Sequence, residues 1–139
     1  MNKFFTIILA SLSFTVSAAD KPIDCSNSSD VKTTIDMNEC LSDNLVLADA
    51  KMNKYLQASL GNNSYDPEVV KSIKIAQKDW KTYRSSNCDS VYTQWREGTI
   101  RNAMSITCSI RLTKQRTHEL WENYLTYEDS TPPVLPEPR

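Results

Sequence analysis

The sequence predicts an all-α domain of three to four helices, stapled by two disulfides and followed by a disordered Pro-rich tail. Glycine occurs only twice in 139 residues, whereas a sheet protein with many tight turns usually needs more. Apolar residues recur at steps of three and four along most of the chain, which is the helical period. Four cysteines follow an N-terminal export signal, and an even cysteine count in an exported chain predicts disulfides.

Residues 1–19 have the pattern of a secretory signal peptide. Lys3 supplies a positive start, residues 4–16 are almost free of charge, and small residues around Ala18 suit signal peptidase. The apolar run is too short to span a bilayer, which takes roughly 20 apolar residues. We therefore expect cleavage near Ala19, a periplasmic or secreted protein, and no stable membrane insertion.

The first helix is predicted from its apolar spacing. Before it, the polar stretch over residues 20–33 is expected to be a loop that Cys25 holds in place. The helix then places one apolar face towards a core, formed by Leu41, Leu45, Ala48, Met52, Tyr55, Leu56 and Leu60. Gly61, Asn62 and Asn63 form a typical stop signal.

Two further helices follow. Asp66 and Pro67 predict the start of the second, because Asp is a favoured N-cap and Pro is favoured in the first turn. Its predicted core face is Val69, Ile73, Ala76, Trp80 and Tyr83. A third helix is expected from about Thr99, with a core face of Ile106, Ile110, Thr113, Thr117, Leu120 and Tyr124. The segment over residues 88–98 is compatible with a short helical turn or with a packed loop.

The composition changes at Glu128. Ser130, Thr131 and four prolines within residues 128–139 predict a disordered tail. We therefore expect the helical domain over residues 20–127. Its length suits one domain with a modest core.

The four cysteines, Cys25, Cys40, Cys88 and Cys108, all follow the export signal. Four cysteines allow three pairings. We predict Cys25 with Cys40 and Cys88 with Cys108, because each pair closes a short loop near a predicted helix end. In the chain-entropy description each bridge contributes about 3 kcal/mol to stability.

A polar network is predicted between the helices. At about 100° per residue, Asp49 lies only about 60° from the centre of the first apolar face, so its carboxylate is partly buried and needs a partner. We expect a bidentate ion pair with Arg84 or Arg116, and Asn53 and Gln77 would complete the network. Such a network either sets the helix register alone or forms an exposed recognition pocket.

The sequence shows no pattern typical of an enzyme. His118 is its single histidine, which provides neither a zinc cluster nor a nucleophile–base pair. A nucleophile elbow, a phosphate loop and a C-x-x-C motif are also absent from the sequence. The 16 basic residues are balanced by 17 acidic ones, which disfavours nucleic-acid binding. We predict a protein that is not an enzyme and uses no cofactor or metal.

Three surface features are candidates for binding a protein partner. Asp36, Glu39 and Asp43 recur at helical spacing opposite the first apolar face, and would speed encounter with a cationic partner. Trp95, in a probable loop, is a candidate anchor. A stripe of Lys71, Lys74, Lys78 and Lys81 on the second helix would suit anionic polymer or lipid headgroups. Such stripes are also typical of solvated helix faces.

Several short motifs occur in a fixed order between residues 25 and 120. They are Met37-Asn38-Glu39-Cys40, the run Ala-Asp-Ala-Lys-Met-Asn-Lys-Tyr over residues 48–55, the pattern A-Q-x-x-W-x-x-Y-R-x-x-x-C over residues 76–88, and C-x-x-x-L-T-x-x-R over residues 108–116. Together they resemble the LprI-type lysozyme-inhibitor family of exported bacterial proteins. The resemblance implies a compact helical domain, no cofactor and, for some members, inhibition of lysozyme.

The leading hypothesis from the sequence is therefore a periplasmic protein that occludes a lysozyme-type peptidoglycan hydrolase. An immunity protein against a secreted wall-targeting toxin is one alternative. A structural or partner-binding module without inhibitory activity is another.

Overall fold

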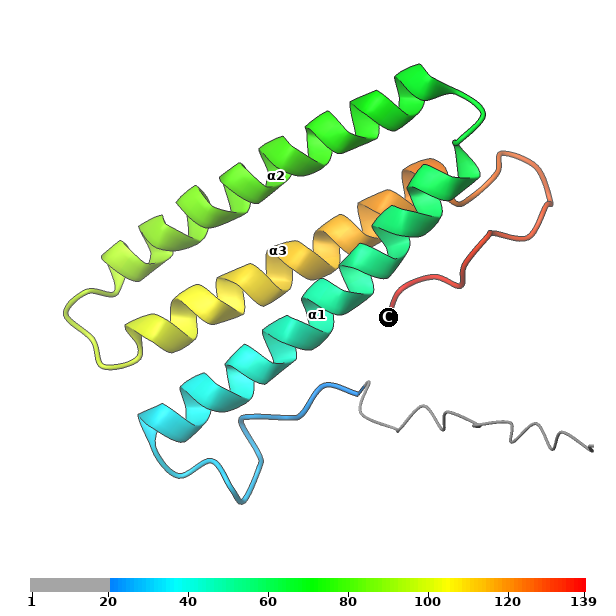
Figure 1. Cartoon of the computed structure of the whole chain (residues 1–139). Coiled ribbons are helices and arrows are strands. Elements are labelled where there is room, and N and C mark those ends of the chain that lie inside the picture. The colour runs from blue at the N-terminus through cyan, green and yellow to red at the C-terminus, as the bar shows by residue number, and fades with distance from the viewer. Residues whose placement is uncertain (1–20) are drawn as a thin grey trace, which may run out of the picture.

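Three long helices make up the fold. The computed structural model describes residues 21–139, so the expected signal peptide lies outside the described residues. The helices are α1 (Thr34–Asn62), α2 (Pro67–Gln94) and α3 (Arg101–Tyr124). They run up, down and up, joined by short turns, so that α1 and α3 are parallel (Figure 1). The predicted all-α fold is confirmed for residues 21–139, where there is no strand and no helix apolar and long enough to cross a membrane.

A capping box starts α1 seven residues before its apolar pattern begins at Leu41. The Thr33 hydroxyl accepts a hydrogen bond from the Asp36 backbone N–H at 3.1 Å. The Asp36 carboxylate in turn accepts from the backbone N–H groups of Lys32 and Thr33, at 3.0 and 2.9 Å. These bonds satisfy donors that a helix start leaves free. They favour the charged carboxylate, so the bond from Lys32 above all holds the pKa of Asp36 below its usual value.

The second helix begins as predicted and runs further than its apolar pattern indicates. Asp66 caps it by accepting from the backbone N–H groups of Glu68 and Val69. It then continues through Cys88 to Gln94. Of the segment over residues 88–98, for which the sequence left helix and loop open, residues 88–94 are therefore helical. No Gly or Pro interrupts this stretch before Gly98, and Val91 packs towards α3 beside the disulfide.

The third helix is central, because α1 and α2 both pack against it. The main core cluster consists of Met52, Tyr55, Leu56, Ile73, Leu120 and Leu125. A smaller cluster surrounds Cys88, Cys108 and Leu112, and Trp80 packs against both. The core therefore follows the length of α3, with the ring of Trp80 connecting its two parts.

The predicted core face of α2 is wrong at two positions. Ala76 is exposed and Tyr83 is 54% exposed. Their neighbours Gln77 and Arg84 turn towards α3 instead. The buried face of α2 is therefore shifted by roughly 50° from the predicted one, because Ile73 and Trp80 remain in the core. Polar partners for Gln77 and Arg84 lie on α1 and α3.

Both predicted disulfides are present. Cys25–Cys40 fastens the N-terminal segment to α1, and Cys88–Cys108 joins α2 to α3. Asn44 reinforces the first of these attachments, since its buried side chain accepts from the Ile23 backbone N–H and donates to the Ile23 carbonyl, at 2.9 and 2.8 Å. Sequence reasoning missed Asn44. The available signal was a polar residue three positions after Leu41, on the apolar face.

The expectation of a disordered tail is wrong, because residues 126–139 fold back along α3 and α1 (Figure 1). The Trp121 indole N–H donates to the Leu135 carbonyl at 2.9 Å, and the Tyr55 hydroxyl donates to the Pro136 carbonyl at 2.7 Å. Leu135 also packs against the main core cluster. Buried aromatic side chains with a polar tip need such partners, and burial raises the pKa of Tyr55.

Removing either disulfide should lower the free energy of unfolding by about 3 kcal/mol, because the loops of 15 and 20 residues would be released in the unfolded chain. The Cys25→Ala/Cys40→Ala and Cys88→Ala/Cys108→Ala variants can be compared with the oxidised protein by urea unfolding. Free thiols in the native protein, detected by mass spectrometry, would contradict the pairing.

The packed tail predicts slow hydrogen exchange at Val134, whose backbone N–H donates to the Leu125 carbonyl at 2.8 Å. Trp121→Phe removes one attachment of the tail and should speed this exchange, whereas Trp95→Phe should leave it unchanged. Exchange can be followed by NMR or mass spectrometry. A rate equal to that of an unstructured peptide in the unmodified protein would show that the tail is free.

Candidate functional site

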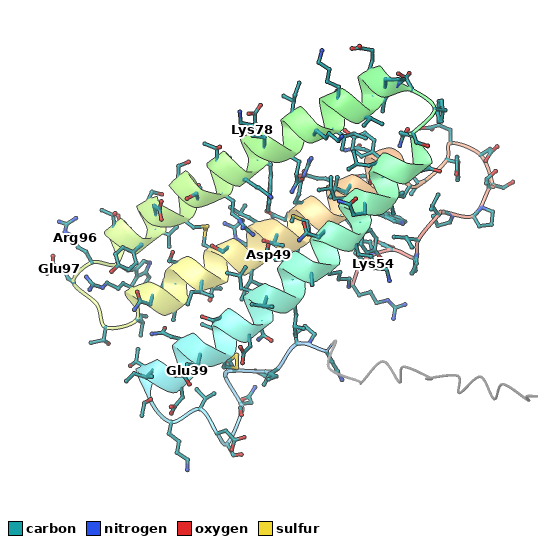
Figure 2. All side chains as sticks on the ribbon, viewed as in Figure 1. Glu39, Asp49, Lys54, Lys78, Arg96 and Glu97 are labelled. Carbon is teal, nitrogen blue, oxygen red and sulfur yellow. A yellow bond between two sulfur atoms is a disulfide. The ribbon has the colours of Figure 1, made fainter. Side chains whose placement is uncertain are left out.

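One arginine connects all three helices. Arg84 on α2 donates through Nη1 to Asp49 Oδ1 on α1 at 2.5 Å and to Thr113 Oγ1 on α3 at 2.6 Å. The Thr113 hydroxyl lies 3.4 Å from the same Asp49 oxygen, and Asp49 occupies the middle of α1 (Figure 2). The structure thus pairs Asp49 with Arg84, through a single nitrogen instead of the expected bidentate geometry, because Thr113 shares that nitrogen.

Arg116, the other arginine considered for this pair, contacts different residues. It is 7% exposed, and its Nε donates to Gln77 Oε1 at 3.0 Å while Nη1 donates to Glu119 Oε2 at 3.0 Å. The Gln77 amide then donates to the Met52 sulfur at 3.4 Å. This second polar layer also spans α1, α2 and α3. Among the described residues, Arg116 Nη2 is buried without a hydrogen-bond partner.

Asn53 does not join the network. It is exposed on α1, and it follows Met52 by about 100° around the helix, which turns it away from the buried face. Its assignment to the network is therefore wrong. Asp49 does belong to the network. It lies three residues before Met52, and this spacing keeps both side chains on one side of α1.

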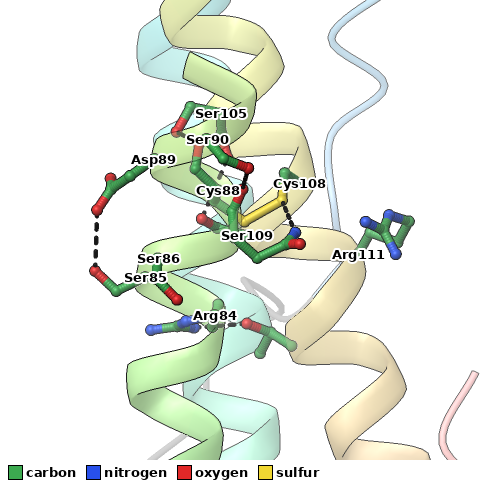
Figure 3. The surroundings of a disulfide bond; sticks show 12 residues. Arg84, Ser85, Ser86, Cys88, Asp89, Ser90, Ser105, Cys108, Ser109 and Arg111 are labelled. Atoms are coloured by element: carbon green, nitrogen blue, oxygen red, sulfur yellow. Dashed lines mark hydrogen bonds between the residues drawn. A yellow bond between two sulfur atoms is a disulfide. The ribbon is translucent and has the colours of Figure 1, made fainter. Parts of the chain in front are cut away.

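The surroundings of Arg84 favour a fixed geometry. Its guanidinium carbon lies 4.9 Å from the centre of the Trp80 ring, a cation–π arrangement. Cys88 follows Arg84 by about one helical turn and joins α2 to α3 through Cys108, as Figure 3 shows. The disulfide therefore fixes the register of α2 on α3 close to the Arg84–Thr113 contact.

The network consists of contacts within the protein. The Arg84 and Asp49 side chains are 21% and 34% exposed, and their contacts are to each other and to Thr113, within the protein. Charged groups that are partly buried need such partners, and hydrogen bonds with fixed directions allow only one register of the helices. The contacts of Arg84 with Asp49 and Thr113 therefore join the three helices.

The candidate partner-binding residues gather at one end of the bundle. Glu39 and Asp43 are exposed in the first half of α1, and Trp95, 41% exposed, caps the C-terminus of α2. Figure 2 shows Glu39 at the same end as the α2–α3 turn that follows Trp95. Asp36 differs from the others, because its carboxylate is engaged in the capping box. The exposed end thus combines two acids and an aromatic ring from two helices.

Replacing Arg84 by Ala should lower the free energy of unfolding by about 2–3 kcal/mol, because Asp49 would remain partly buried without its cation. A double-mutant cycle with Asp49→Ala should give a coupling of about 1–2 kcal/mol. Arg111→Ala is the matched control, since Arg111 is exposed on α3 and should change stability by less than about 0.5 kcal/mol. A coupling near zero would show that the ion pair contributes nothing.

Comparison with known proteins identifies the family of the chain. An uncharacterized protein of Rhizobium meliloti (strain 1021) is 28% identical over 99 residues, which cover 63% of this chain and 71% of the relative. No solved structure matches the chain. A family model described as Lysozyme inhibitor LprI matches residues 25–120, from the first cysteine to the core residue Leu120 of α3. The chain therefore belongs to the LprI family of lysozyme inhibitors.

Proposed function

We propose that this protein acts outside the cytoplasm as a non-enzymatic inhibitor that binds a lysozyme-type peptidoglycan hydrolase and occludes its cleft. The family match over residues 25–120 is the observation that carries the proposal. Export would place the protein where such hydrolases act, in the periplasm or in the medium. It would also allow both disulfides to form, because these persist in oxidising compartments.

The bundle end with Glu39, Asp43 and Trp95 is the surface that we assign to the hydrolase. Trp95 offers a large, partly exposed ring beside Gly98, whose backbone N–H donates to the Trp95 carbonyl at 2.9 Å. Aromatic residues of this kind supply much of the energy at protein interfaces. Glu39 and Asp43 would attract a cationic enzyme and raise the association rate more than the final affinity.

A fixed shape suits occlusion better than a flexible one. The disulfide Cys88–Cys108 and the Arg84 contacts hold the helices that carry these residues. A binding surface that is ordered beforehand loses less conformational entropy on association. The inhibitor would therefore act as a rigid plug and would need no chemical step.

The direct test measures cell-wall lysis by lysozymes of several classes, with and without the oxidised protein. Trp95→Ala should weaken inhibition by roughly 30-fold, equivalent to about 2 kcal/mol. Tyr83→Ala is the matched control, because Tyr83 is also an exposed aromatic residue but lies on the outer side of α2, and should leave inhibition unchanged. Absence of inhibition of every class at micromolar concentration would refute the proposal.

The acidic residues can be tested separately through kinetics. Glu39→Lys with Asp43→Lys should lower the association rate about tenfold at low salt and should reduce its dependence on ionic strength. Asp79→Lys provides the control, since Asp79 is exposed on α2. An equal effect of both charge changes would mean that overall charge matters and the location of the acids does not.

A further inference from the structure

A groove of about 910 Å³ lies along α1 and α3, and none of its lining residues belongs to α2. Its edges come from the two non-helical segments of the described chain, with Pro22 and Ile23 from one and Pro136 to Arg139 from the other. Figure 1 shows both segments on the side of α1 that faces away from α2. The volume lies within the range of about 300–1,000 Å³ that is usual for small-molecule sites.

The floor of the groove is aliphatic. Leu41 and Leu47 on α1 and Ile110 on α3 line it and are only half-buried, and Ile23 at the edge is 52% exposed. Apolar side chains gathered in a hollow mark a binding site more often than scattered ones do. The fold thus leaves a continuous apolar strip that neither α2 nor the tail covers.

The rim is cationic. Lys54 on α1 and Lys114 on α3 are exposed along it, and Arg139 lies at the edge that the tail forms. Lys51 is exposed there as well, but its Nζ donates to the Arg139 carbonyl at 2.7 Å. Glu137 is the single acidic residue among those that line the groove, and its carboxylate lies 3.2 Å from the His118 ring. Lys54 and Lys114 therefore stand at an opening whose lining contains one acidic side chain. The surroundings favour an anionic group at the rim.

The chemistry of the floor decides between classes of ligand. An extended peptide would need partners for its backbone groups, but the helices that form the floor already use theirs in internal hydrogen bonds. Among the polar side chains that line the groove, Asn44 is occupied by Ile23. The hydroxyl groups of Tyr55 and Thr117 already donate to backbone carbonyls. A hydrocarbon chain has no polar groups, so it needs no hydrogen-bond partner on the floor. A single carboxylate at its end would meet the lysines.

We propose that this groove binds a long-chain fatty acid. The hydrocarbon chain lies on Leu41, Leu47 and Ile110, and the carboxylate is held between Lys54 and Lys114. Leu41 lies between Glu39 and Asp43 in the chain but about 160° around α1 from each, so the groove opens on another side of the helix than these acids. The lysine variants below therefore test the groove apart from the hydrolase proposal. The ligand class follows from the combination of an aliphatic floor and a rim of lysines.

Calorimetric titration of the exported, oxidised protein with tetradecanoate, kept below its micelle concentration, tests the proposal. Saturable one-to-one binding and a raised melting temperature are expected, because a ligand that binds only the folded state stabilises it. Tetradecan-1-ol has the same chain without the charge and should bind about tenfold more weakly. Equal binding of acid and alcohol, or no saturable binding of the acid, would overturn the proposal.

Two pairs of charge changes locate the site. Lys54→Glu with Lys114→Glu should weaken tetradecanoate binding about tenfold, whereas Lys71→Glu with Lys78→Glu, the same change on the outer face of α2, should not. Ile110→Asp should abolish binding while circular dichroism confirms the helical fold. An equal loss for both lysine pairs, or association only with phosphatidylglycerol vesicles, would refute the groove as a fatty-acid site.

Discussion

The architecture depends on the contact in which one nitrogen of Arg84 binds both Asp49 and Thr113. The first two helices each pack against α3, so their relative position is set largely through that third helix. Arg84 is the charged side chain of α2 that bonds to both α1 and α3, and Gln77 makes a second, uncharged connection of the same kind. Because hydrogen bonds to charged groups have strict geometry and are strong, a shift of any helix by one turn would break this contact and leave a carboxylate half-buried without its cation.

The same contact explains which side chains of α2 are exposed to solvent. Turning Gln77 and Arg84 inward leaves Tyr83 and Ala76 exposed, together with the lysines of the outer face. Polar partners on α1 and α3 thus outweigh the burial of an Ala and a Tyr. Trp80 still supplies a large apolar contact from α2, because its ring packs against both core clusters. The same ring lies against the Arg84 guanidinium.

The non-helical segments complete the molecule in a comparable way. Asn44 and the Cys25–Cys40 disulfide hold the N-terminal segment on α1, and Trp121 and Tyr55 hold the tail. The hydrogen bonds of Asn44, Tyr55 and Trp121 also give polar atoms of partly or fully buried side chains a partner. The two segments also form the edges of the groove. Attachments that a helical bundle needs for its own stability therefore create a concave surface that three bare helices would lack.

The sequence by itself indicated three to four helices, the Asp66 cap, the disulfide pairs and the family motifs, because these depend on local spacing and residue type. It also indicated Asp49 as a buried charge and Arg84 as its possible partner. Only the tertiary structure decided which arginine pairs with Asp49, how α2 is rotated, and that the Pro-rich tail is packed. These depend on hydrogen-bond partners such as Thr113 and Trp121, which lie far away in the chain and which no local pattern can assign.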